Sequence, residues 1–254
     1  MSEVKNYREL GCQACLNGTA LGFDFSMAFQ PILDLSTRTV FAQEALVRGI
    51  GNLPAATVFK QVNDENRYAF DQACRVKAVS LAARLKMPSL LSINFMPNAV
   101  YRPELCIRTT LKAAEDFGFP ISRIMFEVTE SERVDDIPHL QSIIRHYQQQ
   151  GFTTALDDFG AGFSGLNMLA DLHVDILKLD MHLVRDIDKN GRKHAIVRGV
   201  MATSEELGIK VIAEGVETPQ EYVALREMGI NLFQGFLFAR PAYEALAEID
   251  WQNR

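Results

Sequence analysis

Acidic and polar side chains recur in this sequence at the ends of short apolar runs. Glu127 ends one such run, Asp157 and Asp158 end another, and Glu214 ends a third. No histidine occupies an equivalent position, and oxygen ligands without imidazole or thiolate favour Mg²⁺ or Mn²⁺ over zinc or copper. The residue types therefore predict a divalent-metal site built from carboxylate and amide oxygens. The other members of this set are Gln30, Glu44, Asn94, Lys178 and Gln234.

The adjacent pair Asp157-Asp158 suggests two ions, because one aspartate can bridge the ions while its neighbour binds the second. Paired divalent ions are typical of phosphoryl hydrolysis. Lys178, buried among carboxylates, would stay charged and could orient the attacking water. Arg48 could clamp a phosphate through its planar fork of donors, with a surface salt bridge as the alternative. The glycine-rich segment 158–165 follows the aspartate pair directly and favours a lid over a plain turn.

Strands must bring these residues together, and short apolar runs alternate with amphipathic stretches along most of the chain. This alternation predicts parallel strand–helix–strand units. The connection Asp34–Arg38 is too short for a parallel crossover, so the first two strands should pair antiparallel. About seven or eight strands remain, which favours a closed α/β barrel with one irregular hairpin at its start over an open doubly wound sheet. The expected strands are Met27–Leu33, Thr39–Leu46, Leu90–Phe95, Ile124–Val128, Thr153–Leu156, Ile176–Leu179, Val211–Ala213 and Leu232–Gly235. The expected helices are Ala69–Leu85, Pro103–Phe117, Ile137–Gln149, Lys193–Leu207 and Pro219–Met228, with C-terminal caps near Gly118, Gly151, Gly208 and Gly229.

In such a barrel the C-terminal strand ends share one mouth, where residues distant in the chain meet. The alternative is that each polar residue merely ends its strand and caps the next helix. For any single residue, this alternative is the favoured interpretation. It is weak for the whole set, because so many carboxylates at one mouth would repel one another unless a cation held them.

Length and composition fit one soluble barrel domain. The chain has 254 residues, 48% of them hydrophobic, and a formal net charge of −6. An acidic surface argues against binding to a DNA or RNA duplex, which needs a basic stripe. Neither a membrane span nor a signal peptide is visible, so we expect a cytoplasmic protein without a membrane partner. Residues 1–25 are expected to form a lead-in segment with a short helix, and residues 26–254 the barrel.

Cys12 and Cys15 form the only closely spaced cysteine pair. A structural zinc site needs four ligands, and no second pair follows, so reduced thiols are favoured over zinc.

An ordered series of motifs resembles the EAL domain, the bacterial phosphodiesterase family that linearises cyclic di-GMP. The triplet Glu44-Ala45-Leu46 stands within Gln43-Glu-Ala-Leu-Val-Arg-Gly49, and the series extends over roughly residues 27–243. Its other members are Phe29-Gln-Pro-Ile32, Ile93-Asn94, Phe126-Glu-Val-Thr-Glu130, Leu156-Asp-Asp-Phe-Gly160, Leu177-Lys-Leu-Asp180, Ala213-Glu-Gly-Val-Glu217 and Gln234-Gly-Phe236.

The resemblance implies a TIM-like (βα)8 barrel with one antiparallel strand and two Mg²⁺ or Mn²⁺ ions. Glu44, Asn94, Glu127 and Asp157 would hold one ion, and Asp157 with Asp158 the other, with Glu214 nearby or liganding through water. Lys178 would contact the nucleophilic water, and Glu217 would support the site. Glu130 would steady the glycine-rich loop and, with Glu44, Asp158, Lys178 and Glu214, belong to the catalytic set. The implied substrate contacts are Gln30, Leu46, Arg48, Asp180, Gln234, Gly235, Phe238 and Pro241.

The implied reaction converts cyclic di-GMP to linear pGpG by in-line attack of water, with the 3′ oxygen as leaving group. A homodimer is expected from the family's habit. The chain departs from the family at Met96, where a serine is usual, and in the lid at Ala161, Phe163 and Gly165. By the resemblance, these departures would bear on lid dynamics and dimer coupling more than on the metal site, and no ligand position is lost. The rivals are a catalytically silent cyclic di-GMP receptor and an enzyme for another cyclic dinucleotide or simple diester.

Overall fold

The computed structural model describes residues 21–100, 102–129, 136–162 and 165–251. The predicted lead-in helix, Cys12, Cys15, Glu130 and Phe163 lie outside these residues. None of the helices in the described ranges is long and apolar enough to cross a membrane.

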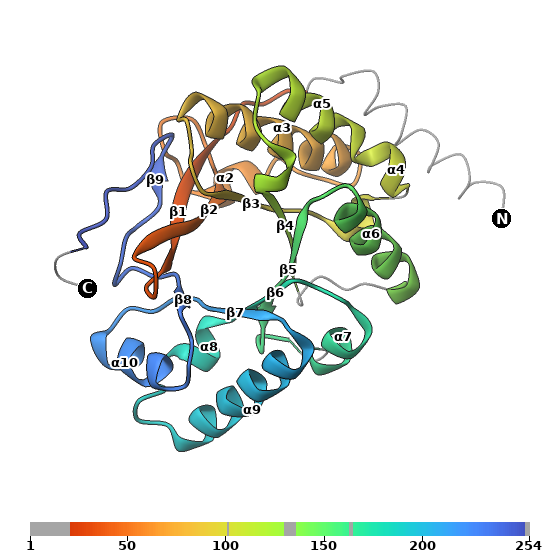
Figure 1. The fold of residues 1–254 in the computed structure, drawn as a ribbon. Helices are drawn as coiled ribbons and strands as arrows, with labels where there is room; N and C mark the ends of the chain where they lie inside the picture. Colours follow the sequence, from red (N-terminus) through yellow and green to blue (C-terminus); the bar gives the residue numbers. More distant parts are fainter. Residues whose placement is uncertain (1–20, 101, 130–135, 163–164, 252–254) are drawn as a thin grey trace.

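The described strands form a closed barrel, which Figure 1 shows as a ring with the helices outside it. Hydrogen bonding runs in the order β2-β3-β4-β5-β6-β7-β8, and β1 closes the ring between β8 and β2. Every pair from β2 to β8 is parallel, whereas β1 is antiparallel to both of its barrel neighbours. The predicted TIM-like barrel with one antiparallel strand is therefore confirmed. The strands are β1 (Ser26–Asp34), β2 (Thr39–Arg48), β3 (Leu90–Asn94), β4 (Ile124–Thr129), β5 (Thr153–Phe159), β6 (Ile176–Leu179), β7 (Lys210–Ala213) and β8 (Leu232–Phe233).

A short additional strand, β9 (Ala242–Tyr243), extends the sheet beside β1. Ala28 pairs with Tyr243 and Phe29 with Ala242, while the far end of β1 pairs with β8. The first strand of the barrel is thus held on one edge by the last strands in the sequence (Figure 1).

The long predicted helices are present, and several short ones were not predicted. The helix expected over 103–117 is two helices that meet at Ile107. Gly118 and Gly208 cap two helices in the left-handed conformation, with φ of 67° and 70°. The helices are α2 (Ala55–Phe59), α3 (Arg67–Arg84), α4 (Pro103–Cys106), α5 (Arg108–Phe117), α6 (Ile137–Gln149), α7 (Gly165–Asp171), α8 (Met181–Val184), α9 (Gly191–Leu207) and α10 (Pro219–Glu227), with 3₁₀ turns η1 (Pro97–Ala99) and η2 (Ile121–Arg123).

Apolar side chains pack in two groups. The larger group lies between the strands and the surrounding helices, and the smaller group comes from the strands alone. Because side chains alternate along a strand, residues two apart share a face, so the smaller group fixes which face of each strand points inward. Its members are Ile32, Ala42, Met125, Ala155, Ile176, Ile212 and Leu232.

Candidate active site

A polar layer lies directly above the apolar group inside the barrel. Glu127 stands two positions after Met125, and Lys178 stands two positions after Ile176. The same spacing puts each following polar residue on the inward face, one layer nearer the mouth. Gln30 obeys the rule in reverse, two positions before Ile32, because β1 runs in the opposite direction. The other members of the layer are Glu44, Asp157, Glu214 and Gln234, each two positions after a member of the apolar group.

Lys178 lies at the centre of this layer. Its Nζ is 2.9 Å from Glu127 Oε2, 2.9 Å from Asp157 Oδ1 and 2.7 Å from Glu214 Oε1. Glu44 Oε2 is 3.8 Å away. These are ion-pair distances, but none has hydrogen-bond geometry, since Lys178 Nζ and both Glu127 carboxylate oxygens are buried without a hydrogen-bond partner. Strands β2, β4, β5 and β7 thus bring four acids to one cation.

Glu44 is held from two sides. Asn94 Nδ2 donates to its Oε1 at 3.0 Å, and Gln234 Nε2 donates to its Oε2 at 2.7 Å. Asn94 is paired with Glu127 across β3 and β4. The two amides therefore fix the Glu44 carboxylate in the layer, although β2 continues four residues beyond it.

Asp157 and Asp158 reach the same site because β5 is irregular there. In a regular strand, adjacent side chains point to opposite faces. The pairing of β5 with β6 shifts register between Leu156 and Phe159, and Asp158 takes a φ of 56°. Such bulges re-aim side chains and are frequent next to active sites. Both carboxylates consequently lie near Glu214.

Burial changes the ionisation of the site. Burial raises the pKa of Glu127 to about 8, although the Lys178 ammonium opposes the change. It likewise raises the pKa of Asp158 to about 6, with the Asp157 charge adding to the effect. Burial would lower the pKa of Lys178, but the surrounding carboxylates hold it well above its ordinary value. Lys178 is therefore protonated, while burial, with repulsion from the neighbouring acids, raises the pKa of Glu214 well above its ordinary value.

The donor set fits divalent cations. Two groups of carboxylate oxygens lie within 4.8 Å of one another: Glu44, Glu127 and Asp157, and then Asp157, Asp158 and Glu214. Asp157 belongs to both groups, as a bridging ligand would. Glu127 Oε1 is buried without a hydrogen-bond partner, which is costly unless a further cation binds it. Hard oxygen donors of this kind suit Mg²⁺ or Mn²⁺.

Two of the predicted substrate residues, Gln30 and Arg48, donate hydrogen bonds to backbone carbonyls. Gln30 donates to the Ala239 carbonyl at 3.3 Å, and Arg48 donates to the Val47 carbonyl at 2.7 Å. Within the described residues Arg48 forms no ion pair, so its alternative role in a salt bridge has no support there. Leu46 and Pro241 are half-buried.

Asp180, Gly235 and Phe238 have visible structural tasks. Asp180 caps α8 by accepting from the His182 backbone N–H at 2.8 Å. A Cβ on Gly235 would lie 2.0 Å from the carbonyl oxygen of Val216, so only glycine fits beside Gln234. Phe238 is buried with its ring 5.9 Å from that of Phe233. Substrate contact by these residues stays a prediction.

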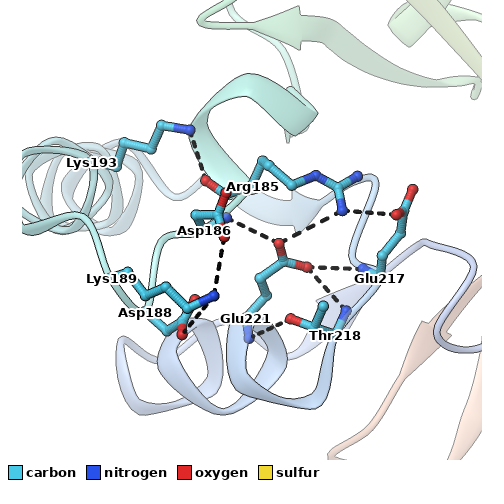
Figure 2. A network of polar contacts seen from close by, with 8 residues as sticks. All are labelled: Arg185, Asp186, Asp188, Lys189, Lys193, Glu217, Thr218 and Glu221. Carbon is cyan, nitrogen blue, oxygen red and sulfur yellow. Dashed lines mark hydrogen bonds and ion pairs between the residues drawn. The ribbon is translucent and has the colours of Figure 1, made fainter.

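A polar network behind the site supports the loop that follows Glu214. Figure 2 shows Glu221 accepting backbone N–H groups from Asp186, Glu217 and Thr218. Arg185 Nη1 lies 2.8 Å from Glu217 Oε2, which ties that loop to the turn after α8. The sequence reading included Glu217 but missed Glu221, whose signal is the capping box Thr218-Pro-Gln-Glu221 at the start of α10.

A buried pair of charged residues in α3 was also not predicted from the sequence. Asp71 and Arg75 form a buried ion pair at 2.7 Å. The signal was available as opposite charges at i and i+4 on a face otherwise made of Phe70, Cys74 and Ala78.

The fold and site together define a closed barrel with one reversed strand and a carboxylate layer around a buried lysine. The family model described as "EAL domain" matches residues 13–241, and this chain belongs to that family. Over 252 residues the chain is 30% identical to the cyclic di-GMP phosphodiesterase NbdA of Pseudomonas aeruginosa, covering 94% of this chain and 31% of NbdA. The chain spans about half the length of the curated relatives it matches, or less.

Solved structures share the fold. A standalone EAL protein from Vibrio cholerae O395, in a c-di-GMP-bound form, is 50% identical with a TM-score of 0.88, over 91% of this chain and 98% of that one. Klebsiella pneumoniae BlrP1, in a complex with manganese and cyclic di-GMP, is 36% identical with a TM-score of 0.85, over 91% of this chain and 59% of that one.

Proposed function

We propose that this protein hydrolyses cyclic di-GMP to linear pGpG with two Mg²⁺ or Mn²⁺ ions. The observation that carries the proposal is the convergence of Glu44, Glu127, Asp157 and Glu214 on Lys178. The proposal is supported by the closeness of the carboxylate oxygens of these acids and of Asp158, which lie in two groups within 4.8 Å. The ligand bound to the Vibrio cholerae relative and the activity in the name of NbdA point to the same substrate.

Each residue has a proposed task. Glu44, Asn94, Glu127 and Asp157 hold one cation, and Asp157, Asp158 and Glu214 hold the other. When bound, the cations supply positive charge that offsets the negative charge of the phosphodiester and favours deprotonation of a nearby water. Lys178, which stays protonated, donates to the attacking oxygen and orients it in line with the scissile bond.

The proposed reaction is the hydrolysis of one phosphodiester bond. The water oxygen bonds to phosphorus, the bond from phosphorus to the 3′ oxygen breaks, and the 3′ oxygen takes up a proton. Arg48 binds a phosphate oxygen, and Gln30 and Asp180 face the guanines or phosphates. Gln234 keeps Glu44 in its liganding position through the 2.7 Å hydrogen bond.

The test is chromatography of cyclic di-GMP incubated with the protein in Mg²⁺, in Mn²⁺ and in EDTA. We expect pGpG to accumulate only with metal. Glu44→Gln should lower the rate at least about 100-fold, because it removes a charged ligand but keeps the shape. Glu205→Gln, an exposed change on α9, is the control and should leave the rate unchanged.

Near-normal turnover by Glu44→Gln would contradict the ligand assignment. Binding of cyclic di-GMP without product, under every metal condition, would replace the enzyme by the silent receptor. Equal turnover of another cyclic dinucleotide or a simple diester would widen the substrate class.

We also propose a cytoplasmic homodimer, and here the resemblance alone carries the proposal. Sedimentation of the protein at micromolar concentration should give a mass near twice 28.5 kDa. Sedimentation as a monomer, with and without ligand, would contradict it. Recovery of the protein with the membrane fraction after cell lysis would contradict the location.

A further inference from the structure

A buried charge pair lies outside the barrel wall, behind two of the proposed ligands. The Asp71 and Arg75 side chains are 2% and 0% exposed, and they meet at 2.7 Å. They belong to α3, which packs against β3 and η1. Taking such a pair out of water is expensive, and apolar residues of similar size often hold a helix as well. The contacts of the two side chains show what the pair does there.

Asp71 fixes the backbone just past Asn94. Its Oδ1 accepts the backbone N–H of Met96 at 3.0 Å. One residue earlier, Phe95 N–H donates to the carbonyl oxygen of Glu127 at 3.0 Å. The segment from Asn94 to Met96 is therefore tied to α3 on one side and to β4 on the other.

Arg75 packs between the residues next to the same two ligands. Its guanidinium carbon lies 5.2 Å from the ring centre of Phe126 and 5.6 Å from that of Phe95. Phe126 directly precedes Glu127, and Phe95 directly follows Asn94. Nη1 of Arg75 donates to the Tyr147 hydroxyl at 3.0 Å, which anchors the guanidinium from α6.

We propose that Asp71 and Arg75 are positioning residues that set the places of Asn94 and Glu127 for the divalent cation. This inference rests on the proposed function. The ion pair acts on the two ligands through the Met96 N–H and the two phenyl rings. Outer partners of metal ligands typically change metal affinity by about 10-fold to 100-fold when they are altered.

The decisive variant is Asp71→Asn, which keeps the shape and removes the charge. Titration calorimetry with Mn²⁺, on the protein without substrate, should show affinity weakened by about 10-fold. At saturating Mn²⁺ the kcat should return toward that of the original protein, since every ligand is still present. Arg75→Lys keeps the charge but loses the planar fork, and it should weaken Mn²⁺ binding in the same direction.

The matched control is Val197→Ala in α9, on another side of the barrel. Val197 is fully buried, so its truncation should lower the melting temperature. Its Mn²⁺ affinity should not change, which separates positioning from a general loss of stability.

Unchanged Mn²⁺ affinity in folded Asp71→Asn would overturn the inference. Should that variant not fold, unchanged affinity in Arg75→Lys would do the same. Loss of affinity in Val197→Ala equal to that of the ion-pair variants would also overturn it. An original protein that binds no Mn²⁺ would instead refute the proposed function, so the two failures are distinguishable.

Discussion

At the scale of single residues, Asp158 has the most demanding backbone in the site. Its φ of 56° lies in a region that costs most L-residues about 1–2 kcal/mol, although aspartate and asparagine tolerate it. The gain is that two neighbouring carboxylates face one site. Charge and conformation can therefore be separated by substitution.

We expect Asp158→Asn and Asp158→Ala both to lose hydrolysis, because both remove the carboxylate. Only Asp158→Ala should lose backbone stability, by about 1 kcal/mol, because asparagine accepts the left-handed conformation and alanine does not. Urea unfolding in EDTA measures this. Equal stabilities of the two variants would show that the conformation costs nothing at this position.

Single residues also show where the sequence was informative. Glu127, Lys178 and Glu214 could be placed because each lies at or near the end of an apolar run, and the C-terminal strand ends of a barrel share one mouth. The β5 bulge could not be placed, because it depends on how β5 pairs with β6 and leaves no local signal. Asp71 and Arg75 escaped notice because charged residues in a helix usually face water.

At the scale of elements, short pieces were the hardest to predict. α7 and α8 have seven and four residues, too short for a helical period to show. The β1–β2 hairpin was predictable because the connection between the two strands is too short for a parallel crossover. The start of α10 carried a capping box, so its support of the Glu214 loop could have been read from Thr218 and Glu221.

Glu221 gives this element a pH-dependent stability. Burial opposes its ionisation, but the backbone N–H groups of Asp186, Glu217 and Thr218 together lower its pKa below the ordinary 4.5. A lowered carboxyl pKa stabilises the folded state above pH 4.5, and this contribution is lost as the pH falls through the folded-state pKa.

We therefore expect Glu221→Gln to lower the free energy of unfolding by about 1–3 kcal/mol at pH 7. The difference from the original protein should shrink below pH 4.5. Glu227→Gln, an exposed change on the same helix, should make no difference at either pH. Urea unfolding at pH 7 and pH 3.5 measures all three proteins, and a constant difference for Glu221→Gln would contradict the capping role.

At the scale of the whole molecule, repulsion among the buried acids of the site opposes the stability of the folded protein. Four acids lie around one lysine in the barrel, and burial with mutual repulsion raises the pKa of two of them, Glu127 and Glu214. A ligand that binds only the folded state stabilises it by mass action. A divalent cation would both neutralise the layer and favour the closed barrel.

We expect Mn²⁺ at about 100 times its dissociation constant to raise the free energy of unfolding by about 2.7 kcal/mol relative to EDTA. At the same Mn²⁺ concentration, Glu127→Gln should show a smaller rise, because the loss of one ligand charge weakens Mn²⁺ binding. Thermal unfolding with and without Mn²⁺ measures both proteins. An identical rise in the two would exclude Glu127 from the site.

The closure of the barrel by β1 also bears on synthesis by the ribosome. Of the described strands, β1 at residues 26–34 emerges before the others, and its partners at 232–233 and 242–243 emerge after the others. β1 can form its hairpin with β2 early, while its other edge has no partner until nearly the whole barrel has been made. Unpaired strand edges invite wrong pairing during folding. During synthesis, aggregation of the growing chain is therefore most to be expected at the free edge of β1, which waits longest for its partners. A chaperone that covers the β1–β2 hairpin would protect this edge throughout that time.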